Sequence, residues 1–107
     1  EKRKYWIVMV GENKGKDLEQ KEKEVEKILK ALANRRRLAI LKLLKESKGM
    51  DVGTIAEKIN LSFKSTSRHL AVMTSADILE KEQKGLNMYY RISSEIPALA
   101  VRITTFL

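Results

Sequence analysis

Two short helical patterns separated by a two-residue break constrain the fold of this chain more than any other feature. The first pattern covers Val52–Ile59 and follows Asp51, a residue type that caps helix N-termini well. Asn60 then tolerates the left-handed conformation that ends helices. The second pattern begins after another good cap, Ser62, and continues to about Ala76. Its buried stripe is predicted to consist of Thr66, Leu70 and Met73.

A hairpin pattern follows this helix pair at once. Residues 78–82 and 88–92 flank a polar segment in which Gly85 supplies the left-handed position of a tight turn. Two helices joined by a tight turn and followed by a hairpin with a basic tip describe a helix-turn-helix with a wing.

Helical periodicity also appears in the segments before and after the helix-turn-helix and its hairpin. Asp17 and Gln20 form a plausible capping box for a helix that reaches about Ala33, and a further helix is predicted over Arg35–Glu46. A last helix is expected after Ser93 or Ser94, with Pro97 tolerated in its first turn. We therefore expect a mainly α chain, with an N-terminal extension over residues 1–16 and one domain over residues 17–107.

The composition narrows the possible chemistry. A chain of 107 residues fits one domain, and its net charge of +8 suits a polyanionic partner. It has no cysteine, and its single histidine, His69, cannot build a metal site or a catalytic group alone. Because no glycine-rich phosphate loop is present either, we expect no enzyme, no metal and no cofactor. The apolar segment Tyr5–Val10 is too short for a signal core, so a cytoplasmic protein is expected.

The second helix and the hairpin tip carry the candidate DNA contacts. Short serine side chains let a helix approach a duplex closely, and an arginine can read guanine bidentately, which makes Arg68 the expected base-reading residue. Ser62 is expected chiefly as a cap, and acidic residues partly balance the charge of the hairpin. The predicted contacts are Ser62, Lys64, Ser65, Thr66, Ser67 and Arg68 on the helix, with Lys84 and Asn87 at the tip.

Apolar stripes on the first and last helices predict a homodimer, because a single small domain would leave them partly uncovered. The expected interface residues are Val25, Leu29, Leu32, Ile96, Leu99, Ile103 and Phe106. Tyr5–Val10 is read as a short strand, although an apolar helical turn that extends the dimer interface would look much the same.

Residues 28–92 resemble the ArsR-type winged-helix repressors. The resemblance rests on the stretches ILKALANRRRLAILKLL and DVGTIAEKINLSFKSTSRHL and on MYYRI at Met88–Ile92. It implies a dimeric transcriptional repressor, paired through its first and last helices, whose second helix of the motif enters the major groove. The chain departs from the family in carrying Asp77 where glycine is common. It also lacks cysteine and any His, Asp or Glu from Ile96 onward, which disfavours metal sensing of the family type.

These observations predict a sequence-specific double-stranded DNA-binding regulator, acting as a homodimeric repressor. The alternative is a winged helix that serves as a protein-interaction or assembly module, with an incidental basic charge. The inducing signal stays open between a small molecule, a protein, a change of pH and none at all.

Overall fold

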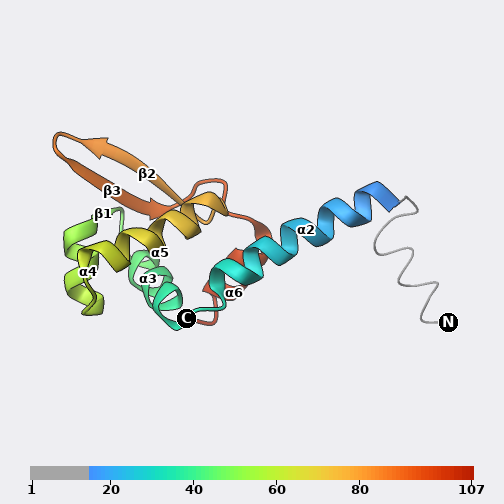
Figure 1. The fold of residues 1–107 in the computed structure, drawn as a ribbon, viewed down its shortest axis with the longest axis horizontal. Helices are drawn as coiled ribbons and strands as arrows, with labels where there is room; N and C mark the ends of the chain where they lie inside the picture. Colours follow the sequence, from blue (N-terminus) through green and yellow to red (C-terminus); the bar gives the residue numbers. More distant parts are fainter. Residues whose placement is uncertain (1–14) are drawn as a thin grey trace.

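The N-terminal helix extends away from the rest of the molecule, whereas the other elements pack around one core (Figure 1). The computed structural model describes residues 15–107, and in this range it contains five helices and three strands. In chain order they are α2 (Gly15–Leu32), α3 (Arg35–Lys45), β1 (Met50–Asp51), α4 (Val52–Ile59), α5 (Phe63–Ser75), β2 (Leu79–Lys84), β3 (Asn87–Ile92) and α6 (Ala98–Thr104). The expected mainly α architecture with a wing is confirmed.

Side-chain caps explain where α3, α4 and α5 begin. The side chain of Asn34 accepts hydrogen bonds from the backbone N–H groups of Arg36 (3.0 Å) and Arg37 (3.1 Å) at the start of α3. Asp51 caps α4 by accepting from the backbone N–H of Thr54 at 3.2 Å. Each cap satisfies donors that the first helical turn cannot bond internally.

The pair α4 and α5 has the expected tight connection. Asn60 adopts the left-handed conformation with φ of 56° at the end of α4, and Ser62 caps α5. Both helices pack on α3, and the centre of the core is fully buried. Its largest side chains are those of Ile40, Leu41, Leu44, Ile55, Leu70, Met73, Ile78 and Leu79.

The sheet has the strand order β1-β3-β2, and both pairings are antiparallel. Strands β2 and β3 form the wing, with Leu79 opposite Ile92 at its base and Lys84 opposite Asn87 at its tip. Gly85 has a φ of 64° at the first position of the two-residue turn, as a tight hairpin requires. The two-residue strand β1 was not predicted, because so short a segment carries no periodic pattern.

A carboxylate joins the wing to the segment that leads to α6. One oxygen of Glu80 accepts from the guanidinium of Arg91 at 2.8 Å, and the other accepts from the backbone N–H of Ser94 at 2.6 Å. The backbone bond from Ser94 is the main cause that holds the pKa of Glu80 below its usual value. The base of the wing is therefore bonded to the chain that follows it.

Two local predictions from the sequence are corrected. Helix α2 begins at Gly15, so Asp17 lies within its first turn rather than capping it. Helix α6 begins after Pro97, and neither Ser93 nor Ser94 caps it; the hydroxyl of Ser93 instead accepts from the backbone N–H of Glu95 at 3.0 Å. The prediction for Tyr5–Val10 and most of the expected extension over residues 1–16 lie outside the described residues.

No helix in the described part of the chain combines the length and the apolar character that crossing a membrane demands.

The backbone conformation of Asp77 generates a stability prediction. Asp77 is exposed and has a φ of 60°, a conformation that glycine adopts without the steric cost of a Cβ atom. We expect Asp77→Gly to raise the free energy of unfolding by about 0.5–1 kcal/mol and Asp77→Ala to lower it by a similar amount. Urea denaturation followed by circular dichroism measures both changes. A glycine variant less stable than the parent would show that the aspartate side chain stabilises this turn.

Candidate nucleic-acid interface

Helix α5 presents a polar face to solvent and an apolar stripe to the core. Among the predicted contact residues, Ser62, Lys64 and Arg68 are exposed, and Ser65 and Ser67 are partly exposed. Leu70 and Met73 on the opposite side are fully buried. The burial of one side thus fixes which side chains α5 can offer to a ligand.

Thr66 was predicted to contact DNA, and the structure corrects this prediction. Its side chain is fully buried, and its hydroxyl oxygen has no hydrogen-bond partner. Thr66 lies about one helical turn before Leu70 and two turns before Met73, so it belongs to the stripe that packs on the core. The prediction that Thr66 contacts DNA is therefore wrong.

The N-terminal end of α5 is prepared to meet a negatively charged group. The hydroxyl of Ser62 accepts from the backbone N–H of Ser65 at 3.1 Å, which confirms its predicted role as a cap. The remaining amides of the first turn and the helix dipole favour phosphate at this end. Phe63 is also 62% exposed here, and the sequence analysis missed it. Its helical spacing places it on the stripe of Leu70, so only its position at the very end of the helix exposes it.

The wing carries cations at its tip and paired charges along its length. The guanidinium of Arg91 donates to Glu82 at 2.9 Å as well as to Glu80. These bonds raise the pKa of Arg91, and the bond to Glu82 is the largest cause. The ammonium of Lys84 lies 5.4 Å from the centre of the Tyr89 ring, and Asn87 is exposed beside it. Lys84 and Asn87 are therefore accessible, as predicted, while Glu80 and Glu82 share the single positive charge of Arg91.

A hydrogen-bond bridge connects α5 to the end of α2. The Nε of Arg37 donates to the Nδ1 of His69 on α5 at 3.2 Å. The Nη1 of the same guanidinium donates to the backbone carbonyls of Lys30 (3.2 Å) and Ala31 (3.3 Å) in the last turn of α2. Because Nδ1 acts as an acceptor, His69 is neutral in this arrangement. The sequence analysis excluded His69 from a metal site and from a catalytic group on its own, but nothing in the sequence linked it to Arg37.

The residues predicted to form the dimer interface differ in their solvent exposure. Val25 is 43% exposed, Leu29 is 49% exposed and Phe106 is 88% exposed, so these side chains are accessible to a partner. Ile96, Leu99 and Ile103 are partly buried against the core. Leu32 is only 4% exposed, so its prediction as an interface residue is wrong; it packs in the core of its own chain.

Among residues 15–107, no cluster of three or more His, Cys, Asp or Glu side chains is placed to hold a metal ion.

A capped helix-turn-helix pair beside a two-stranded wing defines a winged helix-turn-helix transcriptional regulator. The sequence model described as "Bacterial regulatory protein, arsR family" matches residues 34–81. The transcriptional repressor SdpR of Bacillus subtilis is 35% identical over 69 residues, which cover 64% of this chain and 76% of that protein. The chain belongs to the arsR family of bacterial regulatory proteins.

Further relatives agree in sequence and in fold. The arsenical resistance operon repressor of Escherichia coli is 34% identical over 76 residues, covering 71% of this chain and 65% of that protein. A winged helix-turn-helix domain of Mycobacterium bovis, described as homodimeric and DNA-binding, superposes with a TM-score of 0.68 at 32% identity, over 78% of this chain and 74% of that one. Reduced HlyU of Vibrio cholerae gives a TM-score of 0.71 at 26% identity, over 85% and 92% of the two chains. The resemblance to ArsR-type regulators is confirmed.

The bridge between Arg37 and His69 generates a prediction about pH. Burial, and then the positive charges of Arg37 and Arg36, hold the pKa of His69 below its usual value of 6.5. The unfolded chain therefore binds this proton more readily than the folded chain, so the contribution of neutral His69 to stability is complete above the unfolded pKa and is lost as the pH falls. We expect the melting temperature to fall between about pH 7.5 and pH 5.5, and to fall less in His69→Asn, which keeps an acceptor but does not titrate.

Thermal melts of both proteins over this range measure the difference. The carboxylates titrate alike in the two proteins, so they cancel in the comparison. Identical pH profiles would mean that folding does not lower the pKa of His69.

Proposed function

We propose that this chain is a sequence-specific double-stranded DNA-binding repressor that acts as a homodimer in the cytoplasm, with α5 in the major groove. The observation that carries the proposal is the division of α5 into a fully buried stripe and an exposed face with Lys64 and Arg68. A helix oriented in this way by its core contacts presents the same side chains to every duplex that it meets.

The residues on the exposed face of α5 divide into two roles. Arg68 is the one arginine among the candidate contacts on α5, and it has no ion pair in the described part of the chain, so it is free to bond the O6 and N7 atoms of guanine. Lys64, Ser65, Ser67 and the amides of the first turn are suited to phosphate oxygens, which position the helix without reading sequence. Phe63 adds an apolar surface suited to a thymine methyl group.

The wing is proposed to contact DNA beside α5. Lys84 and Asn87 lie opposite each other at its tip, next to the fully exposed Leu86. An ammonium group and a side-chain amide at a hairpin tip are suited to the adjacent backbone or minor groove.

Selection of bound sequences from a random DNA pool tests the function as a whole. We expect a palindrome to be enriched, with half-sites about one helical turn, ~34 Å, apart. A pool without enrichment would contradict the proposal and favour the protein-interaction module. A reporter gene placed under the selected palindrome then separates repression from activation, which matters because HlyU of Vibrio cholerae is named as an activator.

Variants of α5 and the wing test the assigned roles. Arg68→Ala should weaken binding to the selected site by about 1–3 kcal/mol and remove the preference at one base position in each half-site. Lys84→Ala should weaken binding to all sequences alike and make the salt dependence shallower by about one unit per subunit. Fluorescence anisotropy with selected and scrambled duplexes at several salt concentrations measures both effects.

Lys23→Ala is the control, because Lys23 lies on α2, away from α5 and the wing, and forms a local ion pair with Glu19. An unchanged base preference in Arg68→Ala would refute the assignment of Arg68.

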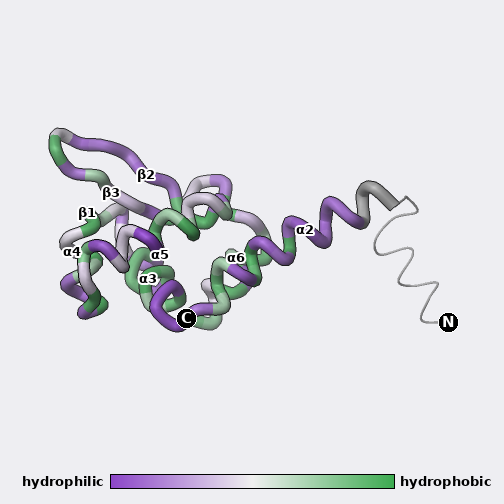
Figure 2. The backbone as a smooth tube through the Cα atoms, viewed as in Figure 1, coloured by the Kyte–Doolittle hydropathy of each residue, from purple (hydrophilic) through white to green (hydrophobic). Residues whose placement is uncertain are grey.

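The dimer is proposed to form through α2 and α6, which contact each other in the fold. Figure 2 shows hydrophobic segments on α6 and on the end of α2 beside it. Exposed apolar side chains on both helices form the surface that a second copy would cover, and they include Val25, Leu29, Val101 and, just beyond α6, Phe106. The similar domain of Mycobacterium bovis is described as homodimeric, which supports dimerisation of this chain.

A single charge on this surface should separate the subunits. We expect Leu29→Glu to sediment as a monomer at micromolar concentration and to lose cooperative binding to the palindrome, because a carboxylate would be buried without a partner. Leu29 is a sharper target than Leu99, whose side chain contacts the core of its own chain. Gln20→Glu, a charge added at an exposed position of the same helix, is the control. A parent protein that sediments as a monomer and binds the palindrome one copy per site would contradict the dimer.

A further inference from the structure

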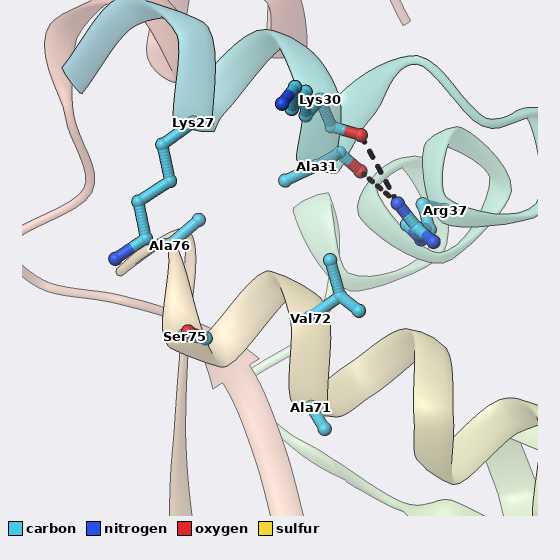
Figure 3. Close-up of a pocket in the computed structure, with 8 residues that line it drawn as sticks. All are labelled: Lys27, Lys30, Ala31, Arg37, Ala71, Val72, Ser75 and Ala76. Carbon is cyan, nitrogen blue, oxygen red and sulfur yellow. Dashed lines mark hydrogen bonds between the residues drawn. The ribbon is translucent and has the colours of Figure 1, made fainter. Parts of the chain in front are cut away.

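A cavity of about 430 Å³ lies where α2, α3 and the C-terminal half of α5 meet (Figure 3). Its apolar wall consists of small side chains, namely Ala31 from α2, Ala71 and Val72 from α5, and Ala76 directly after α5. Val72 is 38% exposed and points from α5 toward Ala31 and Arg37. A volume of this size falls within the range of small-molecule sites.

Three cations surround this apolar wall. Lys27 and Lys30 come from α2, and Arg37 comes from α3. Lys30 lies 3.8 Å from Glu26 in an exposed pair, and within the described residues neither Lys27 nor Arg37 forms an ion pair. In Figure 3 the side chain of Lys27 extends from α2 toward Ala76. An apolar wall beneath three cations, two of which form no ion pair within the described residues, is complementary to a ligand that has an apolar body and an anionic group.

One of the three cations is also the group that bridges α2 and α5. Arg37 donates to the Nδ1 of His69 and to two backbone carbonyls, all of which are neutral acceptors. A carboxylate accepts from a guanidinium in a bidentate geometry and more strongly than a neutral acceptor does. A carboxylate in the cavity would therefore compete with His69 for Arg37.

We propose that this cavity binds a small carboxylate with an apolar body, and that the bound ligand weakens DNA binding by drawing Arg37 away from His69. The second half of this proposal rests on the DNA-binding function proposed above, whereas the first half does not. The α5 residues that line the cavity, Ala71, Val72 and Ser75, follow Arg68 on the same side of the helix at spacings of three, four and seven. The ligand therefore acts one to two turns beyond the base-reading residue, and His69, which follows Arg68 directly, connects the two.

The cavity and the proposed dimer surface lie on different sides of α2. At 3.6 residues per turn, Lys27 is displaced by about 160° around the helix axis from Val25 and from Leu29. Dimerisation through Val25 and Leu29 therefore leaves the cavity open to solvent.

Binding is tested first without DNA, with 4-phenylbutyrate as the probe and the uncharged 4-phenylbutanol as its matched control. In ¹H–¹⁵N spectra of the full chain, we expect the carboxylate to shift the amides of Val72 and Ala76 and to bind more tightly than the alcohol. The double variant Lys27→Gln/Lys30→Gln should bind the carboxylate about fivefold more weakly, because two partly exposed charges are removed. Lys23→Gln, on the same helix but outside the cavity, should bind it as the parent does.

Three results of this first test would overturn the site. These are equal affinity for acid and alcohol, shifts that map to other elements, and equal affinity of the parent and the double variant for the acid. If the double variant instead lost DNA affinity while the acid did not bind the parent, the lysines would be phosphate contacts and the proposal would fall.

The regulatory half is tested on the selected palindrome. Saturating 4-phenylbutyrate should weaken binding by the parent about fivefold or more, and 4-phenylbutanol should not. A ligand that binds the cavity but leaves the affinity for the palindrome unchanged would overturn the regulatory half. If no DNA sequence were selected, the proposed function would fail, while the result of the binding test on the cavity would stand independently.

Discussion

The structure depends on the burial of one side of α5. Leu70 and Met73 have no solvent exposure, and they pack with Ile40, Leu41 and Ile55 from the two preceding helices. Burial of each such side chain contributes about 1.5–3 kcal/mol, so rotation of α5 about its axis would cost several of these contributions at once. The orientation of the exposed face, and with it the identity of the side chains that can reach a ligand, follows from this packing.

A second constraint is polar and joins helices that also meet in the core. Arg37 connects the last turn of α2 with the middle of α5 through hydrogen bonds to Lys30, Ala31 and His69. Since α2 carries exposed apolar residues and α5 carries the candidate DNA contacts, a single guanidinium lies between the surface suited to a partner subunit and the surface suited to DNA.

The sequence predicted the local features well because each depends on neighbouring residues. The caps Asp51 and Ser62 and the left-handed Asn60 were all identified from residue type and position alone. The start of α2 was harder to predict from the sequence, because helix ends depend on weak preferences that several nearby residues share.

The remaining features depend on residues distant in the chain. Arg37 and His69 are 32 positions apart, and neither shows in its local sequence that it needs the other. Thr66 lay on the predicted buried stripe and also among the predicted contacts, and only the packing decided between them. The pairing of Met50 with Tyr90 likewise requires the fold before it can be recognised.

The bonds of Glu80 have a consequence for the geometry of the assembled regulator. Because this carboxylate holds both Arg91 and the backbone of Ser94, the wing and the segment leading to α6 move as one piece. In a dimer paired through α6, the connection between the two wings would then be rigid rather than hinged. A rigid connection of this kind would accept only a narrow range of spacer lengths between half-sites. The tolerance of the regulator for insertions at the operator centre would then depend on the hydrogen bonds of Glu80 at the base of the wing, away from the base pairs.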